Sequence, residues 1–241
     1  MTATAKNPAT INWICYLAIT LLVTIPVAIL TVRSGAWQQG LLLYSVSFAG
    51  SALVLLVALL IMALPRFAPW RKATRIRALF AIPGTLLLLS LLAGRGDYPP
   101  IHDITTDLQN PPQFVTAGKI RGDGSNSLAL QSEVLEMQAG AYPDLQTLVT
   151  SDSIEEAFEQ ALATAGELGW EVYHQDLNSG VIEAVDSTAI MGFKDDVVIR
   201  LNTNAEGTLV DLRSVSRVGI SDLGANAARI RGFLEAFREQ D

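Results

Sequence analysis

The stretch that decides the fold of the C-terminal part is DDVVIRLNTNAEGTLVDLRSVSR, residues 195–217. It contains two runs rich in β-branched and apolar residues, 195–203 and 208–217, separated by Asn204-Ala-Glu-Gly207. Short polar segments with glycine between such runs are typical of hairpin turns. The preceding runs, 170–176 and 180–187, are joined in the same way through Asn178-Ser179-Gly180. We therefore predict four consecutive antiparallel strands.

Helical patterns flank these strands on both sides. Ser153-Ile-Glu-Glu156 has the form of a capping box, and apolar residues then recur at the helical period until Gly169. After the last strand, Ser221 or Asp222 is expected to cap a final helix. The order helix, four strands, helix over 151–241 predicts an α+β fold, with both helices on one face of an antiparallel four-stranded sheet. Because prolines interrupt residues 96–150, we expect an extended lead-in there.

The N-terminal 95 residues have a different composition. Three apolar segments without charge, about 13–32, 40–64 and 78–94, approach the ~20 residues that an α-helix needs to cross a bilayer. We predict a transmembrane region over 1–95, followed by a separate domain over 96–241. The predicted fold class is thus a membrane-anchored α+β protein with three transmembrane helices.

Charge is distributed unequally between these two parts. Residues 1–95 hold 8 of the 17 Lys and Arg residues and none of the 24 Asp and Glu residues. The basic residues concentrate in 65–77, with Lys6 in the N-terminal tail and Arg95 after the third span. Since positive charge stays cytoplasmic, we expect a multi-pass inner-membrane protein with a cytoplasmic N-terminus and a periplasmic C-terminal domain. The acidity of that domain argues against a nucleic-acid partner.

Several blocks of the C-terminal part resemble a known family. They are Ile101-His-Asp-Ile-Thr-Thr-Asp107, Pro111-Pro-x-Phe114, Tyr142-Pro-Asp144, Leu168-Gly-Trp170, Gly192 to Arg200, Val210 to Gly219 and Asp222 to Arg231. Together they resemble domain-of-unknown-function family 1499, found in bacterial membrane proteins and in chloroplasts, over about residues 98–235. The resemblance implies no activity and no site residues, because none is established for the family.

Arginines and carboxylates concentrate in the last two strands and the last helix. The strand period of two places Asp211, Arg213 and Arg217 on one face. The two arginines could grip a carboxylate or phosphate together with Arg200 of the adjacent strand. The candidate ligand-binding residues are Arg200, Arg213, Arg217, Asp222 and Arg229. The alternative is an Asp–Arg network that ties the strands to the final helix. Arginines lining an open concavity would favour binding, whereas arginines paired with carboxylates would favour the structural role.

A second candidate polar site contains a histidine and four aspartates: His102, Asp103, Asp107, Asp195 and Asp196. Its first three members could begin a metal site, but single ligands at this spacing are not specific, and an aspartate that caps a turn is the alternative. Asp195 and Asp196 are adjacent in a strand and should point to opposite sides. We predict no metal and no cofactor, because no nucleotide-binding or metalloprotease motif is present.

Three functional hypotheses follow from these observations. The first is an integral membrane protein that presents a periplasmic binding or interaction domain without catalysis. The second is a membrane-tethered periplasmic hydrolase acting on envelope or lipid-linked material. The third is an anion or lipid sensor that uses the arginines. We expect the lipid bilayer as partner, with envelope proteins or lipids as candidate ligands; the oligomeric state and the enzyme question stay open.

Overall fold

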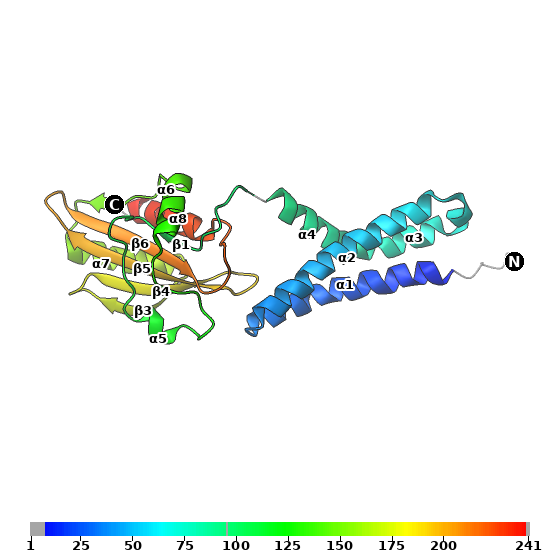
Figure 1. Cartoon of the computed structure of the whole chain (residues 1–241), viewed down its shortest axis with the longest axis horizontal. Helices are drawn as coiled ribbons and strands as arrows, with labels where there is room; N and C mark the ends of the chain where they lie inside the picture. Colours follow the sequence, from blue (N-terminus) through cyan, green and yellow to red (C-terminus); the bar gives the residue numbers. More distant parts are fainter. Residues whose placement is uncertain (1–7, 95, 240–241) are drawn as a thin grey trace. The chain divides into compact units, whose positions relative to one another are not determined.

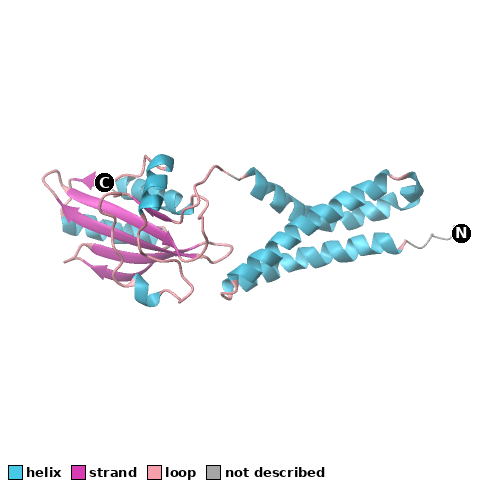
Figure 2. Cartoon of the chain, viewed as in Figure 1, coloured by secondary structure: helices cyan, strands magenta, loops and turns pink. Residues whose placement is uncertain are grey.

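The computed structural model describes residues 8–94 and 96–239, and the chain divides into two compact units, Met1–Arg95 and Gly96–Asp241. The N-terminal unit is entirely helical where it is described (Figure 2). Its elements are α1 (Ala9–Arg33), α2 (Trp37–Ala63), the 3₁₀ helix η1 (Pro65–Trp70), α3 (Arg71–Ala78), the 3₁₀ helix η2 (Leu79–Ala81) and α4 (Ile82–Ala93). Three helical segments, Ala9–Arg33, Trp37–Ala63 and Pro65–Ala93, are long and apolar enough to cross a membrane. The prediction of three apolar helices is confirmed.

The basic segment 65–77 is helical rather than a loop. It forms η1 and most of α3, so the third helical segment starts well before the predicted span 78–94. Arginine and lysine are good helix formers, and proline is tolerated at the first helical position, where Pro65 lies. The basic residues of 65–77 are therefore part of the third helical segment and do not mark its start. Lys6 and Arg95, which contributed to the predicted topology, lie outside the described residues.

Small residues let the N-terminal helices approach closely. Ser47 and Ser51 of α2 are fully buried, and a Cβ on Gly84 would lie 2.7 Å from the Ser51 Cβ. A Cβ on Gly40 would lie 2.7 Å from the backbone nitrogen of Val32. Close backbone approach at small residues is the usual way in which membrane helices pack, since lipid offers no hydrophobic driving force between helices.

The C-terminal unit contains a six-stranded antiparallel sheet, not a four-stranded one (Figure 1). Its elements are β1 (Asp103–Thr105), α5 (Ala117–Ile120), α6 (Ser132–Ala141), β2 (Leu148–Thr150), α7 (Ile154–Glu167), β3 (Glu171–Asp176), β4 (Val181–Ser187), β5 (Lys194–Thr203), β6 (Thr208–Ser216) and α8 (Ala225–Glu239). The order is β1-β6-β5-β4-β3, and β2 pairs with β6 beyond the end of β1.

The two additional strands and two additional helices correct the predicted extended lead-in over 96–150. β1 and β2 are three residues each, too short for an alternating pattern to be recognised. They become strands only because β6 offers its outer edge to both of them. The four predicted strands and the two predicted helices are present, with boundaries that differ by one or two residues from the predicted runs.

Helices α7 and α8 pack on one face of the sheet and form the main core with it. The capping box of Ser153 and Glu156 begins α7, as predicted. Trp170 stacks on Phe233 of α8 with ring centroids 5.3 Å apart. Alternate residues along strands β4, β5 and β6 face these helices: Ile182, Ala184, Val197, Ile199, Leu201, Val210 and Leu212. We call this face of the sheet the helix face.

The opposite face of the sheet is covered by irregular chain. Residues 106–131, which we call the cover segment, reach this face through bonds from Arg213 to the carbonyls of Pro112 and Leu128. The Asn126 amide also donates to Arg217 O. In Figure 1 the green chain of the cover segment and helices α7 and α8 lie on different sides of the strands. We call the covered surface the charged face.

Candidate functional site

The charged face carries the arginines that the sequence singled out. Strand alternation brings Arg200 of β5 and both Arg213 and Arg217, in and just after β6, to this side of the sheet, as predicted for the strand period. Carboxylates from neighbouring strands and from the cover segment reach the same surface. The arrangement of these charges decides whether the face can receive a ligand.

Arg213 is fully buried and forms a two-pronged pair with Asp103 of β1. Its Nε and Nη2 donate to the two Asp103 carboxylate oxygens at 2.9 and 2.7 Å. The remaining donors reach the Pro112 and Leu128 carbonyls, and the Phe114 ring lies 5.4 Å from the guanidinium carbon. Every side of this guanidinium is therefore occupied by the protein itself.

Asp196 gathers two arginines and a tyrosine. Arg217 donates from Nε and Nη2 to its carboxylate at 2.9 and 2.7 Å, and Arg121 Nε of the cover segment lies 2.9 Å away. The Tyr173 hydroxyl donates to Asp196 at 3.4 Å. Burial, followed by the nearby Asp196 charge, raises the pKa of Tyr173 well above its ordinary range, so this phenol stays neutral. Arg121 is not among the residues predicted for a site, because nothing in the sequence of the cover segment indicates its contact with β5.

Arg200 bridges two carboxylates at the edge of the charged face. Its Nη2 lies 2.9 Å from Asp107 and 2.7 Å from Asp211. Asp211 also accepts hydrogen bonds from the hydroxyls of Thr106 and Thr147, at 2.9 and 2.6 Å. These contacts join β5, β6 and the chain on either side of α6.

Glu183 of β4 is buried, and backbone amides rather than an arginine hold its charge. Its carboxylate accepts from the amides of Val115, of Thr116 at 3.0 Å and of Ala117 at 2.8 Å. A buried carboxylate needs hydrogen-bond partners, and these amides supply them. This contact fastens the cover segment to the centre of the sheet.

A second polar cluster lies on the helix face. Arg229 of α8 lies 2.7 Å from Asp186 and 2.6 Å from Asp195, and it donates to Ser214 and Asn226. Asp195 and Asp196 thus point to opposite sides of β5, as predicted. Asp222 caps α8, since its carboxylate accepts from the amides of Gly224 and Asn226 at 2.9 and 2.8 Å.

The predicted ligand-binding residues are therefore distributed over both faces, and the arginines among them are paired. Arg200, Arg213 and Arg217 share the charged face, whereas Arg229 and Asp222 lie with α8 on the other side. This geometry favours the structural alternative for these side chains.

The second candidate site is likewise divided. Asp103 and Asp107 pair with different arginines, and His102 Nδ1 lies 3.2 Å from the Ile220 carbonyl oxygen. Within the described ranges 8–94 and 96–239, no three His, Cys, Asp or Glu side chains converge as metal ligands would.

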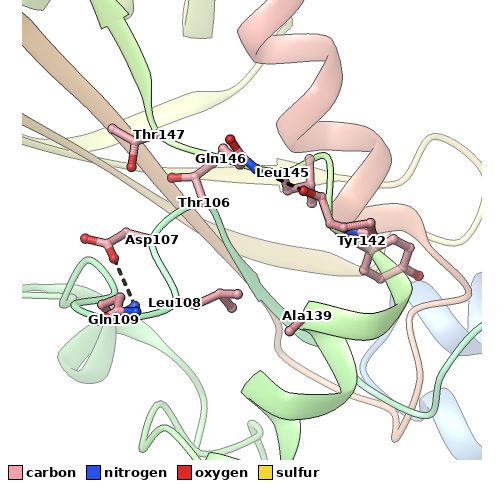
Figure 3. Close-up of a pocket in the computed structure, with 10 residues that line it drawn as sticks. Thr106, Asp107, Leu108, Gln109, Ala139, Tyr142, Leu145, Gln146 and Thr147 are labelled. Carbon is pink, nitrogen blue, oxygen red and sulfur yellow. Dashed lines mark hydrogen bonds between the residues drawn. The ribbon is translucent and has the colours of Figure 1, made fainter.

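An open pocket of about 540 Å³ lies beside this network, between the end of β1 and the loop that follows α6 (Figure 3). Asp107 and Thr147 border one side of it, and Ala139 and Tyr142 border the other. Its lining is Thr106, Asp107, Leu108, Gln109, Ala139, Tyr142, Pro143, Leu145, Gln146 and Thr147. Amides, hydroxyls and apolar side chains dominate, with one carboxylate.

That carboxylate is not available as an acid. Burial raises the pKa of Asp107, but the amides of Asn110 and Gln109 and the Arg200 guanidinium outweigh this effect, so the pKa lies below its usual range. Asp107 is therefore ionised at neutral pH and already accepts three hydrogen bonds. Burial raises the pKa of Tyr142, the other ionisable group of the lining. The pocket offers uncharged hydrogen-bonding groups and one ionised carboxylate, whose charge is already balanced by Arg200.

The sequence analysis placed only Asp107 of this lining among the candidate residues. Thr106 and Tyr142-Pro143 belong to the sequence blocks that resemble the family, and those blocks were the available signal. Nothing local brings them together, because 36 residues separate Thr106 from Tyr142 and both reach the pocket through β6 and α6.

Fold and site together define a class: an α+β domain with one mainly apolar sheet face under two helices and one ion-paired sheet face, preceded by three apolar helices. The chain belongs to the family described as "Protein of unknown function (DUF1499)", whose model matches residues 103–237. The match begins at β1 and ends in α8, so it includes both faces and the pocket. A search of curated proteins found no match.

Proposed function

We propose that this protein is a membrane-anchored binding protein whose C-terminal domain lies on the extracytoplasmic side and holds a ligand without transforming it. The three apolar helices support the anchor, because each has the length and composition of a membrane span. The basic residues of η1 and α3 support a cytoplasmic location for the turn between the second and third helices. In a bacterium with two membranes, this topology puts the domain in the periplasm.

One observation carries the binding role: the pocket beside Asp107 is open, while the arginines of the charged face are already paired. A ligand-binding pocket is typically concave and largely apolar, with a few placed polar groups. This pocket is concave but exposes as much polar as apolar surface, which suits a hydrophilic ligand. The exposed side-chain amides of Gln109 and Gln146 suit a neutral ligand rich in hydroxyl or amide groups.

The hydrolytic alternative has less support from the same lining. General acid–base catalysis needs a group whose pKa lies near the working pH, and glycoside hydrolysis needs two carboxylates. This lining has one carboxylate, with a lowered pKa, and one tyrosine, with a raised pKa. The anion-sensor alternative would require the arginines to release Asp103, Asp196 and Asp211 before they could bind a ligand.

Filling the pocket tests the binding role. Ala139→Trp puts an indole on an exposed position of α6 that borders the pocket, and Ala141→Trp adds the same side chain on α6 outside the lining. Native mass spectrometry of the full chain, extracted from its membrane, should show a bound small molecule in wild type and Ala141→Trp but not in Ala139→Trp. The same spectrum for all three would contradict the binding role.

Reporter fusions test the anchor and its orientation. A periplasm-dependent phosphatase joined after residue 241 should be active in a Gram-negative host, and a cytoplasm-dependent fluorescent protein at the same point should be dark. The reverse pattern would contradict the topology.

A further inference from the structure

One end of the sheet presents exposed apolar side chains on three separate segments. β1 begins at this end, where Asp103 pairs with Val215 near the end of β6. The turn between β4 and β5, residues 188–193, lies at the same end, because Asp195 pairs with Ser216. The exposed fractions here are 79 % for Ile220, 62 % for Leu223, 63 % for Ile190 and 44 % for Tyr98. We call these four residues the apolar tip.

Hydrogen bonds fasten the loop of the tip to the chain that enters the domain. The Asp222 amide donates to Ile101 O at 3.1 Å, and the Ser221 hydroxyl donates to Pro99 O at 3.2 Å. The Tyr98 ring lies against Gly224, where an added Cβ would come within 2.7 Å of a ring carbon. Loop 219–224 and residues 98–101 are therefore one local structure.

The backbone of this loop holds a leucine in an unfavourable conformation. Leu223 has φ of +54°, the one positive φ at a non-glycine residue in the described part of the chain. A leucine is disfavoured in this region because its Cβ crowds the backbone. Gly219 and Gly224, both with positive φ, flank it. The conformation turns an apolar side chain outward instead of burying it, and strained backbone of this kind clusters at functional surfaces.

The other end of the sheet has the opposite character. Its turns are polar: Ser151-Asp152-Ser153 after β2, Asn204-Ala-Glu-Gly207 between β5 and β6, and Asn178-Ser179-Gly180 between β3 and β4, next to Leu177. The exposed large apolar side chains at this end are Leu177, at 41 %, and Val149 of β2, at 44 %, and neither approaches the exposure of Ile220, Leu223 and Ile190. One end of the sheet thus exposes several large apolar side chains, whereas the turns at the other end are mainly polar.

Chain length links the apolar tip to the third apolar helix. Tyr98 is the fifth residue after Ala93, where α4 ends. An extended chain advances ~3.3–3.6 Å per residue, so five residues span at most about 18 Å. If α4 ends at the surface of a bilayer, Tyr98 lies within about 18 Å of that surface, and the loop 219–224 that is bonded to residues 98–101 lies close to Tyr98.

We infer that the apolar tip inserts into the interfacial layer of the same bilayer that holds the three helices, and so fixes the orientation of the domain on the membrane. Tyrosine suits the headgroup level, while isoleucine and leucine suit the boundary with the acyl chains. The partner is thus phospholipid rather than a second protein. This inference rests on the membrane anchor of the proposed function.

Lipid-phase quenching tests this inference in the full chain. Cys15, the single cysteine, lies in α1 and is replaced by serine before cysteine is introduced at Ile220→Cys, at Leu223→Cys or, as the control at the polar end, at Asn204→Cys. Each variant carries a polarity-sensitive fluorophore in phosphatidylcholine–phosphatidylglycerol vesicles that contain a quencher attached to the lipid. We expect blue-shifted emission and loss of intensity at 220 and 223, and neither effect at 204.

Labelling the native Cys15 separates the two hypotheses. If its fluorophore is not quenched by lipid, the helices do not lie in the bilayer and the proposed anchor fails. If Cys15 is quenched while 220 and 223 behave like 204, the anchor stands and the tip inference is overturned. Blue-shifted emission at 220 and 223 without lipid quenching would show that protein covers the tip, which also overturns it. Ile220 does not have a positive φ, so the Ile220→Cys variant reports on the tip even if Leu223→Cys changes the local backbone.

Discussion

The two faces of the sheet in the C-terminal unit are built from alternate residues of the same strands, yet different forces hold them. Leu212 and Arg213 are neighbours in β6, and both are fully buried. Leu212 joins the apolar core under α7 and α8, whereas Arg213 joins Asp103 beneath the cover segment. The core of the helix face is held by shape and apolar area, with one polar cluster around Arg229 at its end, whereas on the charged face each of several buried charges must meet a specific partner.

This difference explains why the charged face can be covered by irregular chain. A helix presents side chains to a sheet, whereas the cover segment also presents backbone carbonyls and amides. Arg213 uses the carbonyls of Pro112 and Leu128, and Glu183 uses the amides of Thr116 and Ala117. Buried polar groups need hydrogen-bond partners. Irregular backbone and the first amides of the short helix α5 supply donors and acceptors that the interior of a regular helix has already used.

The largest expected effect comes from breaking the charged face at its centre. Arg213→Ala leaves Asp103 buried without its cation, and removing one partner of a buried pair costs about 3–5 kcal/mol. Denaturation of the full chain in detergent, followed by near-ultraviolet circular dichroism, should show this loss. The double variant Arg213→Met with Asp103→Leu should recover much of it, since no buried charge is left. A single variant as stable as wild type would contradict the pairing.

The matched change on the helix face is Leu212→Ala, with an expected cost of about 2–5 kcal/mol from lost burial and the cavity left behind. No second substitution on the charged face should rescue it. The two single variants are expected to lose similar amounts of unfolding free energy. The faces are therefore distinguished by whether a second substitution on the charged face restores that stability. Rescue of Leu212→Ala by a change at Asp103 would mean that the faces are not independent.

A smaller effect with a defined pH dependence is expected at Asp107. Its pKa is lowered in the fold, so its contribution is present above the unfolded pKa of about 3.9 and is lost as the pH falls through the lower folded value. Asp107→Asn should thus be less stable than wild type at neutral pH, by at most ~1 kcal/mol because the pair is partly exposed to solvent. The difference should shrink below pH ~4; a constant difference from neutral to acidic pH would exclude this account.

The smallest effect is expected at the exposed pair of Arg231 and Asp144, whose contacts are 2.6 and 2.9 Å. Arg231→Ala should cost about 0–1 kcal/mol, and salt should reduce the cost further. This variant shows what an arginine–aspartate pair contributes when neither face of the sheet buries it. A cost similar to that of Arg213→Ala would mean that burial is not what separates them.

Much of the C-terminal fold could be predicted because its signals are local. The hairpin turns, the capping box at Ser153 and the helical stripes all lie within a few residues of the elements they define. β1 and β2 could not be predicted, since three residues carry no periodic pattern and their strand state depends on the edge of β6. α6 was missed because the prolines and glycines around it suggested extended chain.

The candidate site was predictable only in part. Strand alternation placed Arg200, Arg213 and Arg217 together on one face, and the structure agrees. It could not supply the partners of these arginines, because Asp103 and Arg121 come from segments whose position depends on the whole sheet. The pocket was not predictable for the same reason: its two sides, around Asp107 and Tyr142, meet only through tertiary contacts.

By itself, the sequence determined the division of the chain into an apolar, basic N-terminal part and an acidic C-terminal part, since composition alone carries that division. It also determined the sequence of strands and helices from 151 onward. Tertiary structure decided which charges are paired, where the open pocket lies and which end of the sheet is apolar. Pairing, concavity and surface character depend on residues that are distant in the chain, and only the folded backbone brings these residues within contact distance.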